Sequence, residues 1–144
     1  MPTIEADTGA AELTGGCLCG AVRYRLTAEP FDRGWCHCRM CQLNSGSPAM
    51  AFGSVPADNY LIEQGEAAIR RYQSSEKAER WFCGNCGTPL LFRELAGTTH
   101  DFSIATLDHP HAVPPEFHIY YASHISWAEA PDDGLPRHAR RSTD

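Results

Sequence analysis

Short stretches of alternating apolar and polar residues recur along the chain, and turn-forming residues separate them. Runs of this kind, rich in β-branched and aromatic side chains, are typical of strands with one buried face. No segment has the spacing of a long amphipathic helix, and one short helix is expected around Arg39 to Leu43. The pattern therefore predicts a mainly β domain of antiparallel strands. The expected strands are residues 21–27, 59–63, 68–73, 79–82, 90–93, 102–106 and 117–121.

The length of 144 residues fits a single domain of ordinary size. Neither an internal repeat nor a break in composition divides it. We expect an N-terminal extension of residues 1–12, a domain spanning residues 13–136 and a C-terminal tail of residues 137–144. The tail carries the basic cluster of the chain, and the usual behaviour of termini predicts that it is solvated and frayed.

The charge of the chain argues against some classes of partner. Its formal net charge is −6, and no basic stripe suited to nucleic acid is visible. No window approaches the roughly 18 apolar residues of a membrane span, and residues 1–12 are acidic without an apolar signal region. The seven cysteines cannot all pair within one chain. We therefore expect a cytoplasmic protein that binds neither nucleic acid nor membrane, with its thiols held by metal and not in disulfides.

The seven cysteines fall into three tight clusters. Thiolates at C-x-C and C-x-x-C spacing converge on one soft, tetrahedral cation such as zinc, because each short loop aims two sulfurs at one point. Two pairs then complete a four-thiolate structural site, which would join the start of the sheet to its middle. The pairs are Cys17 with Cys19 in CLCG and Cys83 with Cys86 in FCGNCG; the third cluster is Cys36, Cys38 and Cys41 in CHCRMC.

The middle cluster supplies only three sulfurs, so a zinc ion bound there keeps one open position. His37 lies between two of these cysteines, and in an extended segment its side chain points to the opposite face. Two alternatives remain open. His37 or another histidine closes the site and makes it structural, or Cys38 and Cys41 join Cys83 and Cys86 in a zinc ribbon, although the intervening segment is long for that arrangement.

Three thiolate ligands favour a particular chemistry. They donate strongly to zinc and leave the centre negatively charged, so it acidifies water less than a site of neutral histidines does. Such a centre is better suited to hold an incoming thiol in its deprotonated form. A thiolate at neutral pH is a nucleophile for a small electrophile such as an aldehyde. The ligand set thus points to the addition of a thiol to a carbonyl compound, or to the reverse cleavage of a carbon–sulfur bond.

Over roughly residues 13–136 the chain resembles the glutathione-dependent formaldehyde-activating enzymes, also called the CENP-V/GFA domain. The resemblance implies a β-tent fold of coiled antiparallel sheets with zinc knuckles. It implies two zinc ions per chain, a structural one on Cys17, Cys19, Cys83 and Cys86 and a catalytic one on Cys36, Cys38 and Cys41. It also implies a carbon–sulfur lyase that joins glutathione and formaldehyde. The matching segments are GGCLCGAVRY (15–24), CHCxxC (36–41), SG (45–46), FCGxCGTxL (82–90), HIY (118–120), Trp127 and DGLP (133–136).

The chain departs from the family pattern in two ways. It is shorter than the full enzymes, and Gln42 stands where many family members carry arginine after the last cysteine of the central cluster. The thiol, the electrophile, the direction of reaction and the oligomeric state are not fixed by these residues. Two other functions fit them: a zinc-stabilised binding module without catalysis, and a redox sensor that releases zinc when its thiols are oxidised. His118, in the strand-like segment FHIYY, is expected to be structural.

Overall fold

The computed structural model describes residues 13–129 and 131–143 and contains two β-sheets that share one core. One sheet has three strands in the order β1-β2-β5, and the other has seven in the order β10-β3-β4-β9-β8-β7-β6. One α-helix, α1 (Arg39–Ser45), follows β3 in the described part of the chain. The strands are β1 (Leu13–Gly16), β2 (Arg23–Leu26), β3 (Phe31–Cys36), β4 (Met50–Pro56), β5 (Tyr60–Gln64), β6 (Ile69–Ser75), β7 (Ala78–Cys83), β8 (Pro89–Glu94), β9 (Thr99–Ser103) and β10 (Phe117–Ile119).

This architecture confirms the mainly β fold and the short helix that the sequence predicts. Each of the seven expected strands has a counterpart, although the one expected at 102–106 begins earlier, as β9, and residues 104–106 form a 3₁₀ turn instead. Strands β1, β3 and β4 were not expected. Each contains glycine, and none shows the strict alternation that marks a strand with one buried face.

The core lies between the two sheets and draws on both. Tyr24 of β2 stacks on Tyr60 of β5 with ring centroids 4.5 Å apart, and Phe102 of β9 is completely buried in the same cluster. Val55 and Leu91 add apolar area from β4 and β8. Burial of such side chains contributes roughly 1.5–3 kcal/mol each. The chain therefore has a core of its own, and the cysteine clusters lie at its edges.

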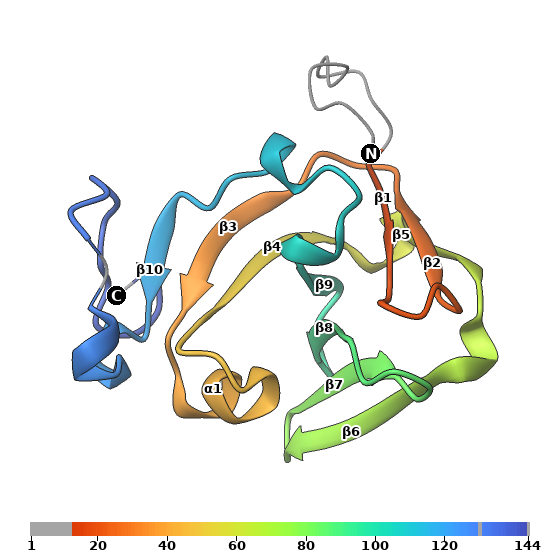
Figure 1. Cartoon of the computed structure of the whole chain (residues 1–144), viewed down its shortest axis with the longest axis horizontal. Helices are drawn as coiled ribbons and strands as arrows, with labels where there is room; N and C mark the ends of the chain where they lie inside the picture. Colours follow the sequence, from red (N-terminus) through yellow and green to blue (C-terminus); the bar gives the residue numbers. More distant parts are fainter. Residues whose placement is uncertain (1–12, 130, 144) are drawn as a thin grey trace.

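Strand β10 pairs with β3 in parallel (Figure 1), whereas the other strand pairs of the described residues are antiparallel. Phe117 of β10 lies opposite Gly34 of β3. A Cβ atom at Gly34 would come within 2.3 Å of the Phe117 ring, so only glycine allows this approach. The parallel pair places the C-terminal part of the chain beside Cys36, the last residue of β3.

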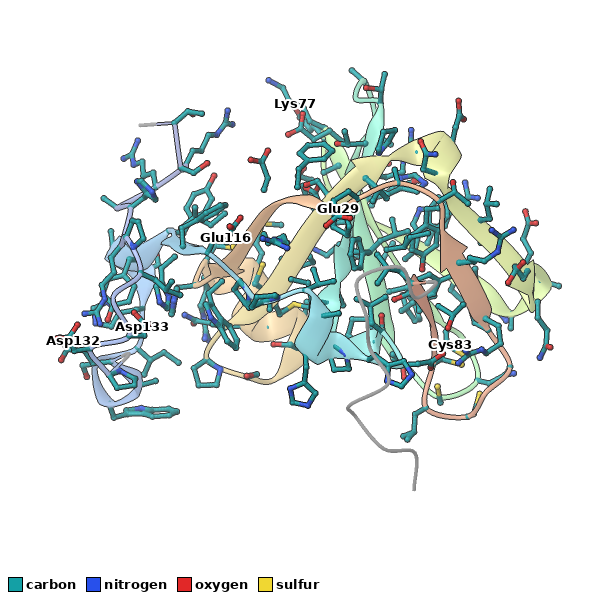
Figure 2. The ribbon with its side chains drawn as sticks, turned by 90° about the horizontal axis from the view of Figure 1, so that it is seen from above. Glu29, Lys77, Cys83, Glu116, Asp132 and Asp133 are labelled. Carbon is teal, nitrogen blue, oxygen red and sulfur yellow. The ribbon has the colours of Figure 1, made fainter. Side chains whose placement is uncertain are left out.

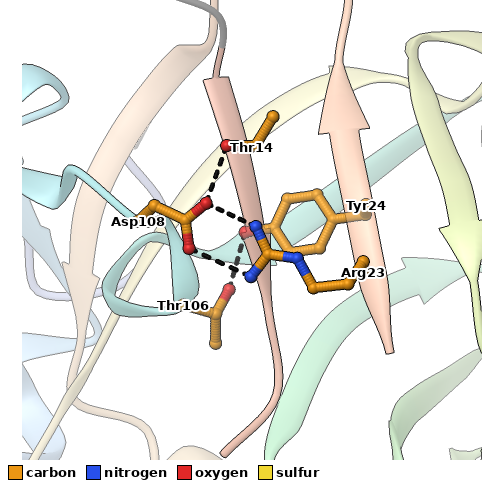
Figure 3. A network of polar contacts seen from close by, with 5 residues as sticks. All are labelled: Thr14, Arg23, Tyr24, Thr106 and Asp108. Atoms are coloured by element: carbon orange, nitrogen blue, oxygen red, sulfur yellow. Dashed lines mark hydrogen bonds and ion pairs between the residues drawn. The ribbon is translucent and has the colours of Figure 1, made fainter. Parts of the chain in front are cut away.

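A polar network joins the three-stranded sheet to the segment that follows β9 (Figure 3). The Asp108 carboxylate accepts hydrogen bonds from both terminal nitrogens of Arg23, at 3.0 and 2.5 Å, and from the Thr14 hydroxyl at 2.7 Å. Beside it, the hydroxyls of Tyr24 and Thr106 are 2.7 Å apart. A two-pronged arginine–carboxylate pair fixes geometry as well as charge, so the network sets how the smaller sheet packs on the larger one.

Replacing Asp108 by asparagine should lower the free energy of unfolding by about 1 kcal/mol at pH 7, because the pair is partly exposed and solvent screens it. The hydrogen bonds from Arg23 lower the pKa of the Asp108 carboxyl. Its stabilisation is therefore complete above the pKa of an unfolded aspartate, about 3.9, and is lost as the pH falls through the lowered value. Urea unfolding should show a constant difference between the two proteins from pH 7 to pH 5 and a smaller one below about pH 4. Asp58→Asn at an exposed position is the control, and an equal loss there would contradict the assignment.

The C-terminal segment corrects one expectation. Residues 137–141 are not a frayed tail, because they run alongside β10 and the turn that follows it. The backbone N–H of His138 donates to the carbonyl of His118 at 2.8 Å, and that of Tyr120 donates to the carbonyl of Arg140 at 2.7 Å. These paired backbone groups fix the segment against the sheet edge.

The proposed boundaries at residues 12 and 136 remain predictions. The expected N-terminal extension, residues 1–12, lies outside the described residues. Among the residues that the structure describes, no helix has the length and apolar character needed to cross a membrane.

Candidate metal centres

Four sulfurs from distant parts of the sequence meet at one end of the molecule. Cys17 and Cys19 lie in the turn between β1 and β2, Cys83 ends β7, and Cys86 lies in the turn before β8. Their sulfur atoms all lie within 4.8 Å of one another. Figure 2 shows Cys83 at the end of the molecule that holds the three-stranded sheet. The group thus joins two turns that come from different sheets.

The spacing of these sulfurs fits a tetrahedral metal ion. Zinc–sulfur bonds of about 2.3 Å give sulfur–sulfur distances of about 3.8 Å in a tetrahedron. The Sγ atoms of Cys17 and Cys19 are 3.6 Å apart, and those of Cys19 and Cys83 are 3.8 Å apart. The backbone N–H of Val22 donates to Cys17 Sγ at 3.2 Å. The Thr88 hydroxyl, 3.3 Å from Cys86 Sγ, helps lower the pKa of that thiol to about 5. Donors of this kind stabilise thiolates, which is the form that binds metal.

The second group contains three sulfurs and is built around the start of α1. Cys36 is the last residue of β3, Cys38 is the N-cap of α1, and Cys41 lies in its first turn. Cys38 Sγ accepts a hydrogen bond from the Cys41 backbone N–H at 3.3 Å. This N-cap contact holds the Cys38 sulfur against the first turn of α1, which carries Cys41. The three sulfurs lie within 4.8 Å of one another, and no fourth cysteine, histidine or carboxylate among the described residues joins them.

Hydrogen bonds among the three thiols separate their acidities. The hydrogen bonds that Cys38 receives from Cys36 and Cys41 lower the pKa of Cys38 to about 2. The hydrogen bond between Cys36 and Cys38 raises the pKa of Cys36. In this arrangement the Cys38 thiolate accepts hydrogen bonds from the two neighbouring thiols. A divalent cation would replace those two protons and be bound by three thiolates.

The sulfurs group as the counting of cysteines predicts. Cys38 and Cys41 lie with Cys36, and they are not grouped with Cys83 and Cys86 as a zinc ribbon would require. His37 does not join the sulfurs. That both groups bind metal remains a prediction, and their geometry fits it.

His37 instead begins a chain of polar groups in which His37 and His118 are buried and Asp133 is exposed. Its Nε2 lies 2.8 Å from His118 Nδ1, and His118 Nε2 lies 2.8 Å from the carboxylate of Asp133. The Asp133 carboxylate accepts a hydrogen bond from His118, and one of the two facing imidazole nitrogens of His37 and His118 donates to the other. The Nδ1 of His37 is buried without a hydrogen-bond partner. The chain ties the loop between two cysteines to the C-terminal segment, and it agrees with a structural His118. The residue pattern alone did not reveal the role of Asp133.

Gln42 has a structural role that the sequence did not suggest. Its side chain is buried, and its amide nitrogen donates to the carbonyls of His37 and Ser123 at 2.9 and 3.1 Å. Its amide oxygen accepts a hydrogen bond from Arg39 at 3.1 Å. Because arginine has no acceptor atom, glutamine at this position both fixes α1 to its surroundings and orients a neighbouring guanidinium.

Arg80 of β7 reaches the three-sulfur group from the other side. Its two terminal nitrogens lie 3.7 and 3.6 Å from Cys41 Sγ, and its guanidinium lies over the Phe92 ring, 5.1 Å from the ring centroid. The side chain is only 8 % exposed. Nothing in the sequence around Arg80 suggests this contact, because Arg80 and Cys41 are 39 residues apart and meet only in the folded chain.

A pocket of about 310 Å³ adjoins α1 on the side of Arg39 and Gln42. Its lining includes Leu43, Ser47 and Trp127, and Trp127 is 77 % exposed. The pocket thus combines apolar surface with one guanidinium. It lies beside the helix whose N-cap is Cys38, a residue of the three-sulfur group.

Fold and sites together define a β protein built around two candidate metal centres, one with four sulfurs and one with three. Residues 12–123 match the family described as glutathione-dependent formaldehyde-activating enzyme. The chain belongs to this family, as its cysteine pattern indicated.

Individual relatives agree with this assignment. An uncharacterised lyase of Schizosaccharomyces pombe is 36 % identical over 96 residues, which cover 67 % of this chain and 68 % of the relative. A Halomonas elongata protein, named as a candidate glutathione-dependent formaldehyde-activating enzyme, is 29 % identical over 128 residues, or 81 % and 80 % of the two chains. A crystal structure of a Rhodobacter sphaeroides protein has a TM-score of 0.57 at 19 % identity and covers 86 % of this chain and 98 % of its own. That last likeness supports the fold alone.

Proposed function

We propose that this protein is a zinc-dependent carbon–sulfur lyase that adds a thiol to a small aldehyde or cleaves such an adduct. One observation carries the proposal: Cys36, Cys38 and Cys41 form a group that no fourth side chain of the described residues completes. A scaffold has no need for an incomplete ligand set. In this proposal two zinc ions bind per chain, and the four-sulfur group of Cys17, Cys19, Cys83 and Cys86 is structural. Reduced thiol ligands fit a cytoplasmic location.

The reaction requires a thiolate and an electrophilic carbon held close together. Zinc bound by three thiolates would supply an open position where an incoming thiol loses its proton and is held as a thiolate. The thiol sulfur forms a bond to the aldehyde carbon, and the carbonyl π electrons move to the oxygen. That oxygen takes up a proton, which balances the one lost by the thiol. The product is a hydroxyalkyl thioether, and the reverse steps cleave it.

The residues around the three-sulfur group suggest how the rest of the thiol is held. We place it in the pocket beside α1, where Trp127 and Leu43 offer apolar contact. Arg39 lies three positions before Gln42 on the same helix face and is held by its amide oxygen. A guanidinium there suits a carboxylate of the thiol, although position 42 itself carries no charge. Glutathione has such carboxylates, and a relative is named for glutathione and formaldehyde.

Exchange spectroscopy tests the proposal directly. Carbon-13 NMR of labelled formaldehyde with glutathione reports the rate at which free aldehyde and adduct interconvert, and this reaction also has an uncatalysed rate. We expect the protein to raise the exchange rate in proportion to its concentration while the equilibrium ratio stays the same. Glutathione should be compared with its ester, in which the carboxylates are blocked. Exchange at the uncatalysed rate with every thiol would refute the lyase and favour a zinc-stabilised binding module.

A further inference from the structure

Arg80 is a buried cation in an unusual setting. Its side chain is 8 % exposed, and it forms no ion pair with a carboxylate among the residues that the structure describes. Its Nε has no hydrogen-bond partner. Burial of an unpaired charge is unfavourable by several kcal/mol, so a guanidinium kept at such a position needs a compensating negative charge.

The compensating group is Cys41, which lies directly beside the guanidinium. Both terminal nitrogens of Arg80 lie within 3.7 Å of Cys41 Sγ, while the Phe92 ring covers the guanidinium. A neutral thiol is a weak acceptor and would do little for the cation. The arrangement is therefore explained when the three-sulfur group carries net negative charge.

Charge balance shows what this cation favours. A divalent ion with three thiolates has one net negative charge, and a thiolate as fourth ligand raises it to two. A neutral fourth ligand, such as water or imidazole, leaves it at one. A fixed positive charge a few ångströms away in a buried site therefore stabilises the anionic ligand more than the neutral one.

We infer that Arg80 is a specificity-determining positioning residue, whose guanidinium on Cys41 makes the three-sulfur centre select an anionic sulfur ligand over a neutral ligand. This inference rests on the proposed function, since it concerns the position where the thiol would bind. Among the described residues, the hydrogen-bond partners of the four-sulfur group are neutral N–H and hydroxyl groups, and Arg23 acts on Cys17 only through longer-range electrostatics. The two centres thus differ in whether a guanidinium contacts a sulfur directly as well as in the number of their sulfurs.

Ligand binding to the cobalt-substituted protein tests the inference without an activity assay. Cobalt gives a thiolate-to-metal absorption band, and the four-sulfur site supplies a constant background. We would titrate 2-mercaptoethanol and, separately, imidazole into wild type, Arg80→Met and Arg80→Lys at one pH. Methionine removes the charge at similar volume, and replacing a buried charge by an apolar side chain is often neutral for stability.

We expect Arg80→Met to weaken thiol binding about 10- to 100-fold and to change imidazole binding less than about threefold, in the range typical of residues that contact metal ligands. Arg80→Lys should recover most of the thiol affinity. Arg71→Met is the matched control, because Arg71 also stacks on an aromatic ring, at 4.0 Å from the Trp81 centroid, but is exposed and has no cysteine contact.

The possible outcomes separate the two proposals. Unchanged thiol binding in Arg80→Met, or an equal loss for thiol and imidazole, would overturn the role of Arg80 and leave the lyase proposal standing. Failure of wild-type protein to bind any thiol would overturn both proposals.

Discussion

Replacing Cys86 by alanine should remove one metal ion from each chain and abolish cooperative thermal unfolding. Cys86 and Cys83 join the turn before β8 to the turn between β1 and β2, which carries Cys17 and Cys19. The apolar cluster beneath these turns is small, and two of its four buried members, Cys17 and Cys83, are themselves cysteines. A metal ion bound by these four sulfurs would therefore be the principal link between the turns.

The expected magnitude is large. A structural zinc site contributes roughly 10–16 kcal/mol of apparent free energy in small domains, and a whole domain is stable by only about 5–15 kcal/mol. Metal analysis and circular dichroism during heating would measure the loss. Asn85→Ala, in the same turn, is the control and should retain both ions and a sharp transition. A Cys86→Ala protein that keeps two ions and melts like wild type would show that the four-sulfur group is not a structural centre.

Replacing Cys38 by alanine should also remove one ion, yet leave the protein folded. The three-sulfur group lies on α1 and the end of β3, and the main core between the sheets does not include it. The variant loses the cap that Cys38 Sγ gives to the Cys41 N–H. The loss of such a cap costs about 0.5–2 kcal/mol, which corresponds to a fall in Tm of only a few degrees.

The same variant should lose all acceleration of thiol–aldehyde exchange, because the open ligand position disappears with the metal. Metal content, Tm and the carbon-13 exchange rate should be measured on one preparation. Met40→Ala is the matched control, because Met40 lies between the same cysteines and is 43 % exposed. If Cys38→Ala unfolds as completely as Cys86→Ala, the second centre is structural. If it retains wild-type exchange, the chemistry lies elsewhere.

The two substitutions distinguish the lyase from its alternatives. A binding module predicts that neither substitution affects exchange, since wild type would not accelerate it. A redox sensor predicts that mild oxidation of the thiols releases metal. Zinc release measured against thiol oxidation would identify that behaviour.

The sequence alone determined the fold class and the cysteines that make up each short cluster. Alternation identified seven of the strands, because a half-buried strand must alternate. Strands β1, β3 and β4 escaped because glycine interrupts each of them and, in β4, consecutive buried residues obscure the signal. The C-x-C and C-x-x-C spacings predicted that the sulfurs within each cluster meet, because ligands that are close in sequence can reach a single ion. They left open the partner of each pair, and the close approach of Cys19 and Cys83 sulfurs is consistent with the predicted pairing.

Only the tertiary structure decided what surrounds the sulfurs. Arg80 meets Cys41 across 39 residues of sequence, and Asp133 reaches His37 through His118 from near the C-terminus. Neither contact leaves a local pattern, because buried charge and hydrogen-bond partners are set by which distant segments meet in the folded chain and by the parallel pairing of β10 with β3. Ligand spacing is a short-range property that a sequence records, whereas the charge beside a ligand is a long-range property that only folding determines.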